Sequence, residues 1–326
     1  MIITRTPFRV SFCGGGSDLP QFYIKHGGCV LSAGINKYMY IMVHPSFAEN
    51  TIMLKYSQTE IVNDVNEVQH KYYRSILSKL DVNGVEIVST ADVPAGTGLG
   101  SSSSFTVGVL HALYAYKGKY VSKEKLAEQA CNIEIVDLME PIGKQDQYAA
   151  AYGGLNFITF NKDGSVFVEP VIMPGRKRDE LEKNLLLFYT GDTRSASNIL
   201  REQSEKIKNA DAEDKQKRIC TLAHELRKEL EKGNIDFLGQ VLHESWMLKR
   251  TLAEGISNSS IDEAYEIALK NGATGGKLLG AGGGGFLLFY VPHDKQPDVR
   301  KAIKMREMEI GFDKQGSSVI YIGDQP

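Results

Sequence analysis

Clusters of glycine are the feature that most limits how this sequence can fold. The chain contains 32 glycines, and many of them gather at residues 14–16, 96–100, 153–154, 275–276 and 282–285. Glycine has no Cβ atom, so such clusters indicate backbone that turns sharply or approaches a ligand closely. Between the clusters, short apolar runs alternate with runs of helical period. This arrangement predicts an α+β fold in which loops contact the ligand.

The expected elements divide into two lobes. A chain of 326 residues exceeds the size at which one hydrophobic core usually stops growing. The Pro-Gly-Arg-Lys-Arg run at 174–178 is the best boundary, giving lobes 1–178 and 179–326 with a cleft between them. Strands are predicted at 8–13, 38–43, 85–91, 184–190, 286–291 and 317–322. Helices are predicted at 66–79, 102–116, 122–137, 195–232, 234–250, 259–270 and 296–309, where 195–232 is either one long helix or a pair of helices.

Composition narrows the class of protein. The 38 basic and 40 acidic residues give a net charge of −2, without the basic excess of nucleic-acid-binding proteins. Cys13, Cys29, Cys131 and Cys220 are too scattered for a zinc site or a disulfide framework. The amino terminus has no signal-peptide pattern, and no apolar run is long enough to span a membrane. We therefore expect a cytoplasmic protein that binds neither nucleic acid nor membrane, with its oligomeric state left open.

The sharpest local signal is the glycine- and serine-rich segment 94–104, Pro-Ala-Gly-Thr-Gly-Leu-Gly-Ser-Ser-Ser-Ser. It lies between a predicted strand and a predicted helix, so free backbone N–H groups and the positive end of the helix dipole can bind phosphate there. No Gly-Lys-Ser/Thr follows, as a Walker loop requires, and the third glycine of a dinucleotide-binding fingerprint would fall at Ser103. The alternative is a flexible loop with a serine helix cap.

This segment resembles the second motif of the GHMP kinases, the superfamily of galactokinase, homoserine kinase, mevalonate kinase and phosphomevalonate kinase. Residues 7–18 and 277–285 resemble the first and third motifs, in the same order. The resemblance implies a first lobe like domain 2 of ribosomal protein S5, a ferredoxin-like second lobe, and ATP between them. The residues it implies for nucleotide binding are Pro94, Gly96, Gly98, Leu99, Gly100, Ser101, Ser102 and Ser103.

The same resemblance implies a catalytic pair. The segment 143–147, Gly-Lys-Gln-Asp-Gln, is similar to the galactokinase segment that carries the catalytic aspartate, which maps onto Asp146. Arg9 corresponds to the arginine of the first motif, and a nearby guanidinium would keep Asp146 ionised so that it accepts the proton of the attacking hydroxyl. The alternatives are an acid at a helix amino terminus and a surface cation.

Magnesium prefers hard oxygen ligands and takes few of them from protein. Glu134 precedes Asp146 by 12 positions, as the corresponding galactokinase glutamate does, and we expect Glu134 and Ser102 to hold Mg²⁺. Asp137, one helical turn away, is an alternative ligand. Glu134 could also be an ordinary solvated side chain.

The first motif bears on the acceptor. Asp18 aligns with a sugar-binding aspartate of galactokinase, but Gly15 and Gly16 replace the Glu-His pair found there. Residues 12–18 and 188–197 instead resemble bacterial D-glycero-D-manno-heptose 7-phosphate kinases, which make the 1,7-bisphosphate. A kinase for an unphosphorylated sugar, such as L-fucose or galactose, and a non-catalytic sugar and ATP sensor are the alternatives.

A phosphorylated acceptor needs cations beyond those that serve ATP. Lys144 and Arg194 are the candidates near the motifs, and Arg194 precedes a predicted helix start that could share the anion. Arg194 could equally be a surface side chain paired with Asp192. Gly283 of the third motif is also assigned to the acceptor site, whereas Lys277 is given no role. Because Asp146 and Arg9 are both present, catalysis is favoured over sensing.

Overall fold

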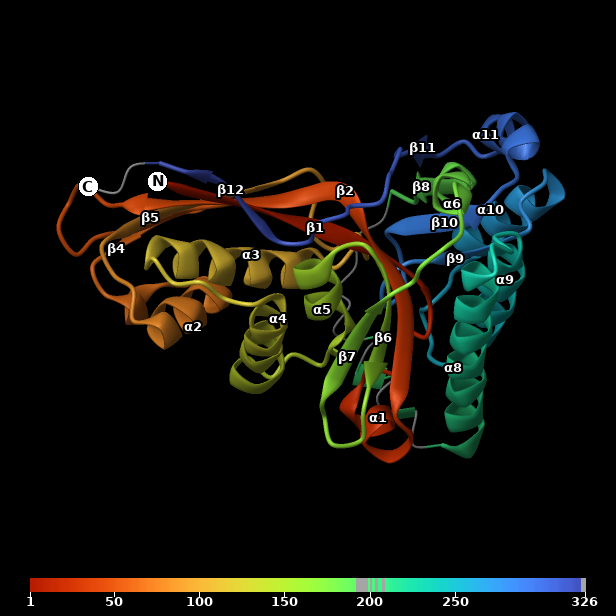
Figure 1. Ribbon diagram of the computed structural model, residues 1–326, viewed down its shortest axis with the longest axis horizontal. Coiled ribbons are helices and arrows are strands. Elements are labelled where there is room, and N and C mark those ends of the chain that lie inside the picture. Colours follow the sequence, from red (N-terminus) through yellow and green to blue (C-terminus); the bar gives the residue numbers. More distant parts are fainter. Residues whose placement is uncertain (192–198, 200, 203–204, 207–208, 324–326) are drawn as a thin grey trace.

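The computed structural model describes residues 1–191, 199, 201–202, 205–206 and 209–323, and it has two lobes side by side. The first lobe is built on an eight-stranded sheet in the order β12-β1-β2-β5-β3-β4, with β6 joined to β2 and β7 joined to β6 (Figure 1). Its strands are β1 (Ile2–Cys13), β2 (Gly28–Pro45), β3 (Ile52–Lys55), β4 (Thr59–Val62), β5 (Val85–Ala91), β6 (Leu155–Phe160), β7 (Val166–Pro170) and β12 (Ser318–Ile322).

The long antiparallel pair of β1 and β2 forms the spine of this lobe. The register shifts between Pro7 and Phe8 and again between Ser11 and Cys13, which bends the pair. Beyond the bend, β2 pairs with β6 in place of β5. Burial alternates along the first residues of β1, but every residue from Thr6 to Cys13 is buried. The bend therefore carries the first motif from a half-exposed sheet into the interior.

The helices of the first lobe lie on one face of this sheet (Figure 1). The central helix α3 packs on β1 and β2, where Gly108 permits close approach because a Cβ atom there would lie 3.0 Å from Thr6 Oγ1. The helical segments are α1 (Pro20–His26), η1 (Val65–Glu67), α2 (Lys71–Leu80), α3 (Ser101–Tyr116), α4 (Lys123–Cys131), the π-helix η2 (Asn132–Asp137) and α5 (Gln145–Tyr152).

The second lobe has a four-stranded sheet in the order β11-β8-β10-β9, covered by helices. Its strands are β8 (Leu185–Tyr189), β9 (Gly275–Leu278), β10 (Phe286–Tyr290) and β11 (Arg306–Glu307). Its helices are α6 (Lys177–Lys183), α8 (Ala210–Glu231), α9 (Phe237–Lys249), α10 (Ser259–Lys270), η3 (His293–Lys295) and α11 (Gln296–Ala302). Among the described helices, none is long and apolar enough to cross a membrane.

Three predicted elements differ from the structure. The segment 318–322 belongs by sequence division to the second lobe, but it returns to the first lobe and pairs with β1, which brings both termini to one end of the molecule (Figure 1). The helix expected at 296–309 ends at Ala302, because Arg306 and Glu307 pair with β8. The helix expected at 122–137 changes at Asn132 from α to π geometry.

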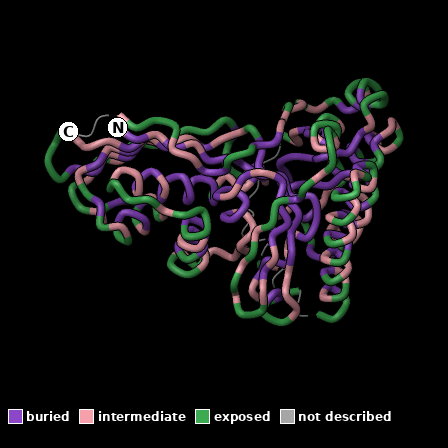
Figure 2. The backbone as a smooth tube through the Cα atoms, viewed as in Figure 1, coloured by how far each residue is buried: buried purple, intermediate pink, exposed green. Residues whose placement is uncertain are grey.

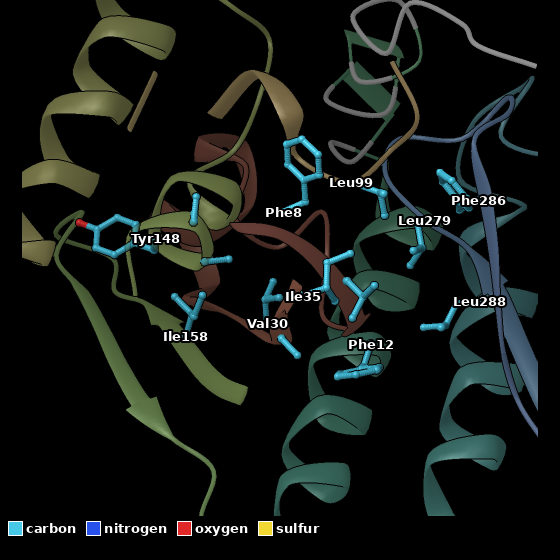
Figure 3. Close-up of a cluster of buried hydrophobic side chains, with 14 of the residues drawn as sticks. Phe8, Phe12, Val30, Ile35, Leu99, Tyr148, Ile158, Leu279, Phe286 and Leu288 are labelled. Carbon is cyan, nitrogen blue, oxygen red and sulfur yellow. The ribbon is translucent and has the colours of Figure 1, made fainter. Parts of the chain in front are cut away.

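One hydrophobic core runs through both lobes. Buried backbone lies along the facing sides of the sheets and helices, whereas the outer helix faces are exposed (Figure 2). In the close-up of Figure 3, Phe8 and Leu99 of the first lobe lie near Leu279 and Phe286 of the second. The loops of the second and third motifs thus pack on the same hydrophobic core.

Candidate active site

The three glycine-rich motifs meet around one cleft. Apart from Gly143, the described glycines that line it come from these three segments: Gly15, Gly16, Gly96, Gly98, Gly100, Gly280, Gly282 and Gly284. The loops of the second and third motifs touch through their backbones, because a Cβ atom on Gly98 would lie 2.6 Å from the carbonyl oxygen of Leu279. Gly98 also has a φ of +80°, which favours glycine. Glycine is therefore needed here for contact between the loops as well as for any bound phosphate.

The second motif ends in a helix start that can receive an anion. Gly100, with φ +75°, precedes Ser101, the first residue of α3, and no side chain caps this terminus. Ser101, Ser102 and Ser103 line the cleft beside it. Uncapped N–H groups and the helix dipole make this a phosphate-binding geometry.

Two of the expected nucleotide-binding residues support this loop from behind. Leu99 is fully buried, and its carbonyl oxygen accepts the Arg9 backbone N–H at 3.0 Å. The carbonyl oxygen of Pro94 accepts the Thr97 hydroxyl at 3.0 Å. Neither residue lines the cleft, whereas the other six expected residues, Gly96, Gly98, Gly100, Ser101, Ser102 and Ser103, do.

Arg9 and Asp146 form a two-pronged ion pair in the cleft. Arg9 Nε donates to Asp146 Oδ1 and Arg9 Nη2 to Asp146 Oδ2, both at 2.8 Å. The remaining Arg9 nitrogen, Nη1, donates to the carbonyl oxygen of Gly98 at 2.6 Å. The Arg9 side chain is 4% exposed and that of Asp146 24%. The structure thus brings together a carboxylate that solvent or substrate can reach and the guanidinium expected beside it.

Asp146 also lies beside the phosphate-binding terminus. It is in the first turn of α5, and a Cβ atom placed on Gly100 would lie 3.4 Å from its Oδ2. The carboxylate is therefore adjacent to the start of α3. A hydroxyl held between this terminus and Asp146 could lose its proton while attacking a phosphoryl group.

Glu134 has a different environment. It is 0% exposed and accepts hydrogen bonds from Ser103 Oγ at 2.8 Å, Thr106 Oγ1 at 2.6 Å and Gln147 Nε2. Burial raises the pKa of Glu134 to about 7, although these donors oppose the shift.

The two expected metal ligands are neighbours, because Ser102 Oγ lies 3.4 Å from Glu134 Oε1 and also lines the cleft. The alternative ligand Asp137 instead pairs with Lys79 at 2.8 Å. Within the described part of the chain, no group of three or more His, Cys, Asp or Glu residues is placed to hold a metal ion by itself.

Asp18 joins the first motif to the helix that carries Asp146. Its Oδ1 accepts the Gly16 N–H at 2.9 Å and its Oδ2 accepts the Gln145 N–H at 3.1 Å. Burial and the nearby Asp146 raise the pKa of Asp18. Gly143 permits this contact, because a Cβ atom there would lie 1.9 Å from Asp18 Oδ2. Asp18 lines the cleft as expected, but backbone donors already occupy both of its oxygens.

Two of the remaining acceptor candidates, Lys144 and Gly283, do not line the cleft. Lys144 donates to the carbonyl oxygen of Gly164 at 2.7 Å and lies 4.9 Å from the centre of the Tyr23 ring, in a separate hollow. The β6–β7 turn holds this side chain, and the acceptor role expected for Lys144 stays a prediction. The Gly283 N–H donates to Ile256 at 3.0 Å, and its neighbours Gly282 and Gly284, not Gly283, line the cleft. Arg194 lies outside the described residues.

Two lysines that line the cleft were assigned no functional role from the sequence. Lys277, on β9, is 5% exposed, and its Nζ donates to the carbonyl oxygen of Phe12 at 3.3 Å. Lys249, the last residue of α9, donates to the carbonyl oxygen of Gly280 at 2.5 Å. Both line the cleft. Lys277 could have been suspected from its place in the third motif, but nothing in the sequence separates Lys249 from its neighbour Arg250, which pairs with Asp262.

This chain belongs to the GHMP kinases. Its residues 63–154 match the family of GHMP kinase N-terminal domains, and residues 226–306 match the family of GHMP kinase C-terminal domains. The chain is therefore a sugar kinase that uses ATP as its phosphoryl donor, and the predicted fold class is confirmed.

The chain is similar to kinases named for heptose phosphates and to a fucokinase. D-glycero-alpha-D-manno-heptose 7-phosphate kinase of Campylobacter jejuni is 30% identical, with 97% of each chain covered. The crystal structure of a D-glycero-D-manno-heptose 1-phosphate kinase from Bacteroides thetaiotaomicron has a TM-score of 0.82 at 26% identity, covering 99% of this chain and 100% of that one. The bifunctional fucokinase/GDP-fucose pyrophosphorylase of Arabidopsis thaliana is 29% identical over 92% of this chain and 30% of its own length.

Proposed function

We propose that this kinase transfers the γ-phosphoryl group of ATP to the anomeric O1 of D-glycero-D-manno-heptose 7-phosphate. The product would be the 1,7-bisphosphate, an intermediate of nucleotide-activated heptose biosynthesis. The observation that carries the catalytic part of this proposal is the Arg9–Asp146 pair, whose carboxylate lies beside the amino terminus of α3. The intact pair also argues against a non-catalytic sensor.

In this mechanism the acceptor hydroxyl attacks the γ-phosphorus as its proton passes to Asp146. A new bond forms between O1 and phosphorus, the bond from phosphorus to the β-phosphate oxygen breaks, and ADP leaves. Arg9 fixes the direction of the Asp146 carboxylate through two charged hydrogen bonds. The N–H groups at the start of α3 are placed to receive the charge on the transferred group.

Ser102 and Glu134 fit the expected role as magnesium ligands. Their oxygens are adjacent, and the buried Glu134 carboxyl accepts bonds only from neutral donors, so a cation would favour its ionised form. When bound, Mg²⁺ would neutralise charge on the nucleotide phosphates.

The acceptor assignment rests on the first motif and on the relatives. Gly15 and Gly16 leave backbone where galactokinases carry two polar side chains, which makes room at the acceptor end of the cleft. The C. jejuni relative is named for a heptose 7-phosphate. An unphosphorylated sugar such as L-fucose is the second candidate, because the Arabidopsis relative is named a fucokinase.

The test is a substrate panel. The purified protein, ATP and Mg²⁺ would be incubated with D-glycero-D-manno-heptose 7-phosphate, the same heptose without phosphate, the heptose 1-phosphate, L-fucose and D-galactose. Mass spectrometry would identify the product, and ³¹P NMR would locate its new phosphate. Selective formation of the 1,7-bisphosphate supports the proposal. If L-fucose or the heptose 1-phosphate is the preferred substrate, the proposed acceptor is wrong. The assignment as a kinase would still hold.

A further inference from the structure

Two lysines that line the cleft have no acidic partner among the described residues. Lys249 comes from the end of α9 and Lys277 from β9, and the only hydrogen bond described for each ammonium goes to a backbone carbonyl oxygen. Across the described residues, neither forms an ion pair with a carboxylate. Each ammonium therefore keeps donors that no described protein group takes up. A buried cation without a charged partner is costly unless an anion arrives to pair with it.

The neighbouring cation of the cleft already has a charged partner. Arg9 forms two hydrogen bonds to the carboxylate of Asp146 and one to the carbonyl oxygen of Gly98. Lys144 is held at Gly164 in a separate hollow. Among the described residues that line the cleft, Lys249 and Lys277 are thus the cations without a carboxylate partner.

The positions of the two lysines connect both ends of the cleft. Lys277 donates to Phe12, two residues before the glycine turn of the first motif that faces the acceptor. Lys249 donates to Gly280, whose Cβ position would lie 2.6 Å from the Cα atom of Gly98 in the nucleotide loop. The pair therefore lies where a phosphate group would approach from either substrate.

We propose that Lys249 and Lys277 together bind one phosphate group in the cleft, in addition to the phosphates received at the start of α3. This inference rests on the proposed function and deepens it. The phosphate has two possible sources, the phosphate already on the acceptor and the terminal phosphate of the nucleotide. Both present the same tetrahedral oxyanion, which matches two converging ammonium groups.

The charges around Lys249 and Lys277 make the binding of phosphate by these two lysines depend on pH. Burial lowers the pKa of Lys249 to about 7, with Lys277 and Arg9 adding to the effect and Asp18 and Asp146 opposing it. Burial lowers the pKa of Lys277 to about 8; the nearby Cys13 opposes this shift and Arg9 adds to it. Because a lysine with a lowered pKa loses its charge as the pH rises through that value, phosphate affinity should fall between pH 7 and pH 9. Proton uptake should accompany binding.

The first experiment measures binding without turnover. Isothermal titration calorimetry would follow inorganic phosphate binding to wild type, Lys249→Met and Lys277→Met, at pH 7 and pH 9, with and without a saturating non-hydrolysable ATP analogue and Mg²⁺. Lys119→Met, at an exposed loop position, is the matched control for loss of one positive charge. We expect a loss of phosphate affinity of roughly ten- to a hundredfold in each cleft variant and none in the control.

Two comparisons within this experiment distinguish the two possible sources of the phosphate. If the acceptor supplies it, phosphate still binds wild type beside the ATP analogue, and the cleft variants raise KM for heptose 7-phosphate while KM for ATP stays within about twofold. If the nucleotide supplies the phosphate, the ATP analogue abolishes binding of inorganic phosphate to wild type. The cleft variants then lose more affinity for the ATP analogue than for ADP. Either pattern supports the site.

Wild-type phosphate affinity in both folded variants would overturn the proposal. Lys249→Arg, which keeps the charge, should restore binding, and failure of that rescue would point to a packing role. Thermal unfolding of each variant, with and without phosphate, checks the fold. Because calorimetry needs no acceptor turnover, its outcome remains separate from the substrate panel: a kinase inactive on heptose 7-phosphate can still show or lack this phosphate site.

Discussion

Two carboxylates of the first lobe, Asp146 and Glu134, are 12 positions apart in sequence. Their electrostatic environments are opposite. Asp146 is partly exposed and receives two charged hydrogen bonds from one guanidinium. Glu134 is fully buried and is surrounded by three hydroxyls and an amide, all of them neutral. Both are linked to the start of α3, Asp146 through its position beside Gly100 and Glu134 through Ser103.

The difference shows how one site can hold two acids in different states. A guanidinium favours the charged form directly, whereas neutral donors only partly offset the cost of burying a charge. In the proposed mechanism Asp146 accepts the hydroxyl proton, and Glu134 is the proposed oxygen ligand of the cation. The following predictions test this division of roles.

The largest effect should come from Asp146→Asn. The amide keeps the shape of the side chain but cannot accept the hydroxyl proton, so kcat should fall by at least about 10²-fold. Calorimetry with the ATP analogue should show nearly unchanged nucleotide binding. Wild-type turnover at saturating acceptor would remove Asp146 from the mechanism and make Glu134 the candidate base.

Arg9→Met tests the charged partner itself. Without the guanidinium, the carboxylate at 146 loses the two charged hydrogen bonds that fix its direction. We expect a fall in kcat of roughly ten- to a hundredfold near neutral pH. Arg9→Lys, which keeps the charge but not the two-pronged geometry, is the matched variant and should retain more activity. Equal kcat values for wild type and Arg9→Met would contradict the comparison.

Glu134→Gln tests the buried carboxyl through stability. The pKa of Glu134 is raised from 4.5 to about 7 in the folded protein, so the stability linked to its proton is complete below pH 4.5 and is lost as the pH rises to 7. In magnesium-free buffer, the free energy of unfolding of wild type should therefore fall relative to Glu134→Gln, by up to about 3 kcal/mol.

Urea unfolding of both proteins from pH 5 to pH 8 measures this difference. Parallel curves would mean that the hydrogen bonds at Glu134 offset its burial. The variant should also need more Mg²⁺ for half-maximal activity, since an amide is a weaker ligand than a carboxylate.

The smallest effect is expected for Lys144→Met. Lys144 is two residues from Asp146 in sequence, but its ammonium is bound at Gly164. KM for the acceptor should change by less than about twofold, within the range of a surface substitution. A large rise in that KM would show that Lys144 leaves Gly164 to meet the substrate, and Asp146 would then have a second cationic neighbour.

The sequence predicted well what is encoded locally. The glycine-serine segment required a turn and a helix start, and α3 begins at Ser101, one residue from the expected 102. The strand expected at 85–91 matches β5 residue for residue, because its apolar run is bounded by turn-forming residues. The pairing of Arg9 with Asp146 was also anticipated, through the resemblance of two separate motifs to a known family.

Tertiary packing decided the rest. Lys144 and Lys249 have long side chains whose directions depend on contacts from distant segments, the β6–β7 turn for one and the third-motif loop for the other. The burial of Glu134 depends on α3 and α5 closing over η2, and the return of β12 to β1 depends on an edge left open by the first lobe. A local pattern specifies backbone turns and helix starts, because these depend on neighbouring residues. Which charges face one cleft is decided only when elements far apart in the chain pack together.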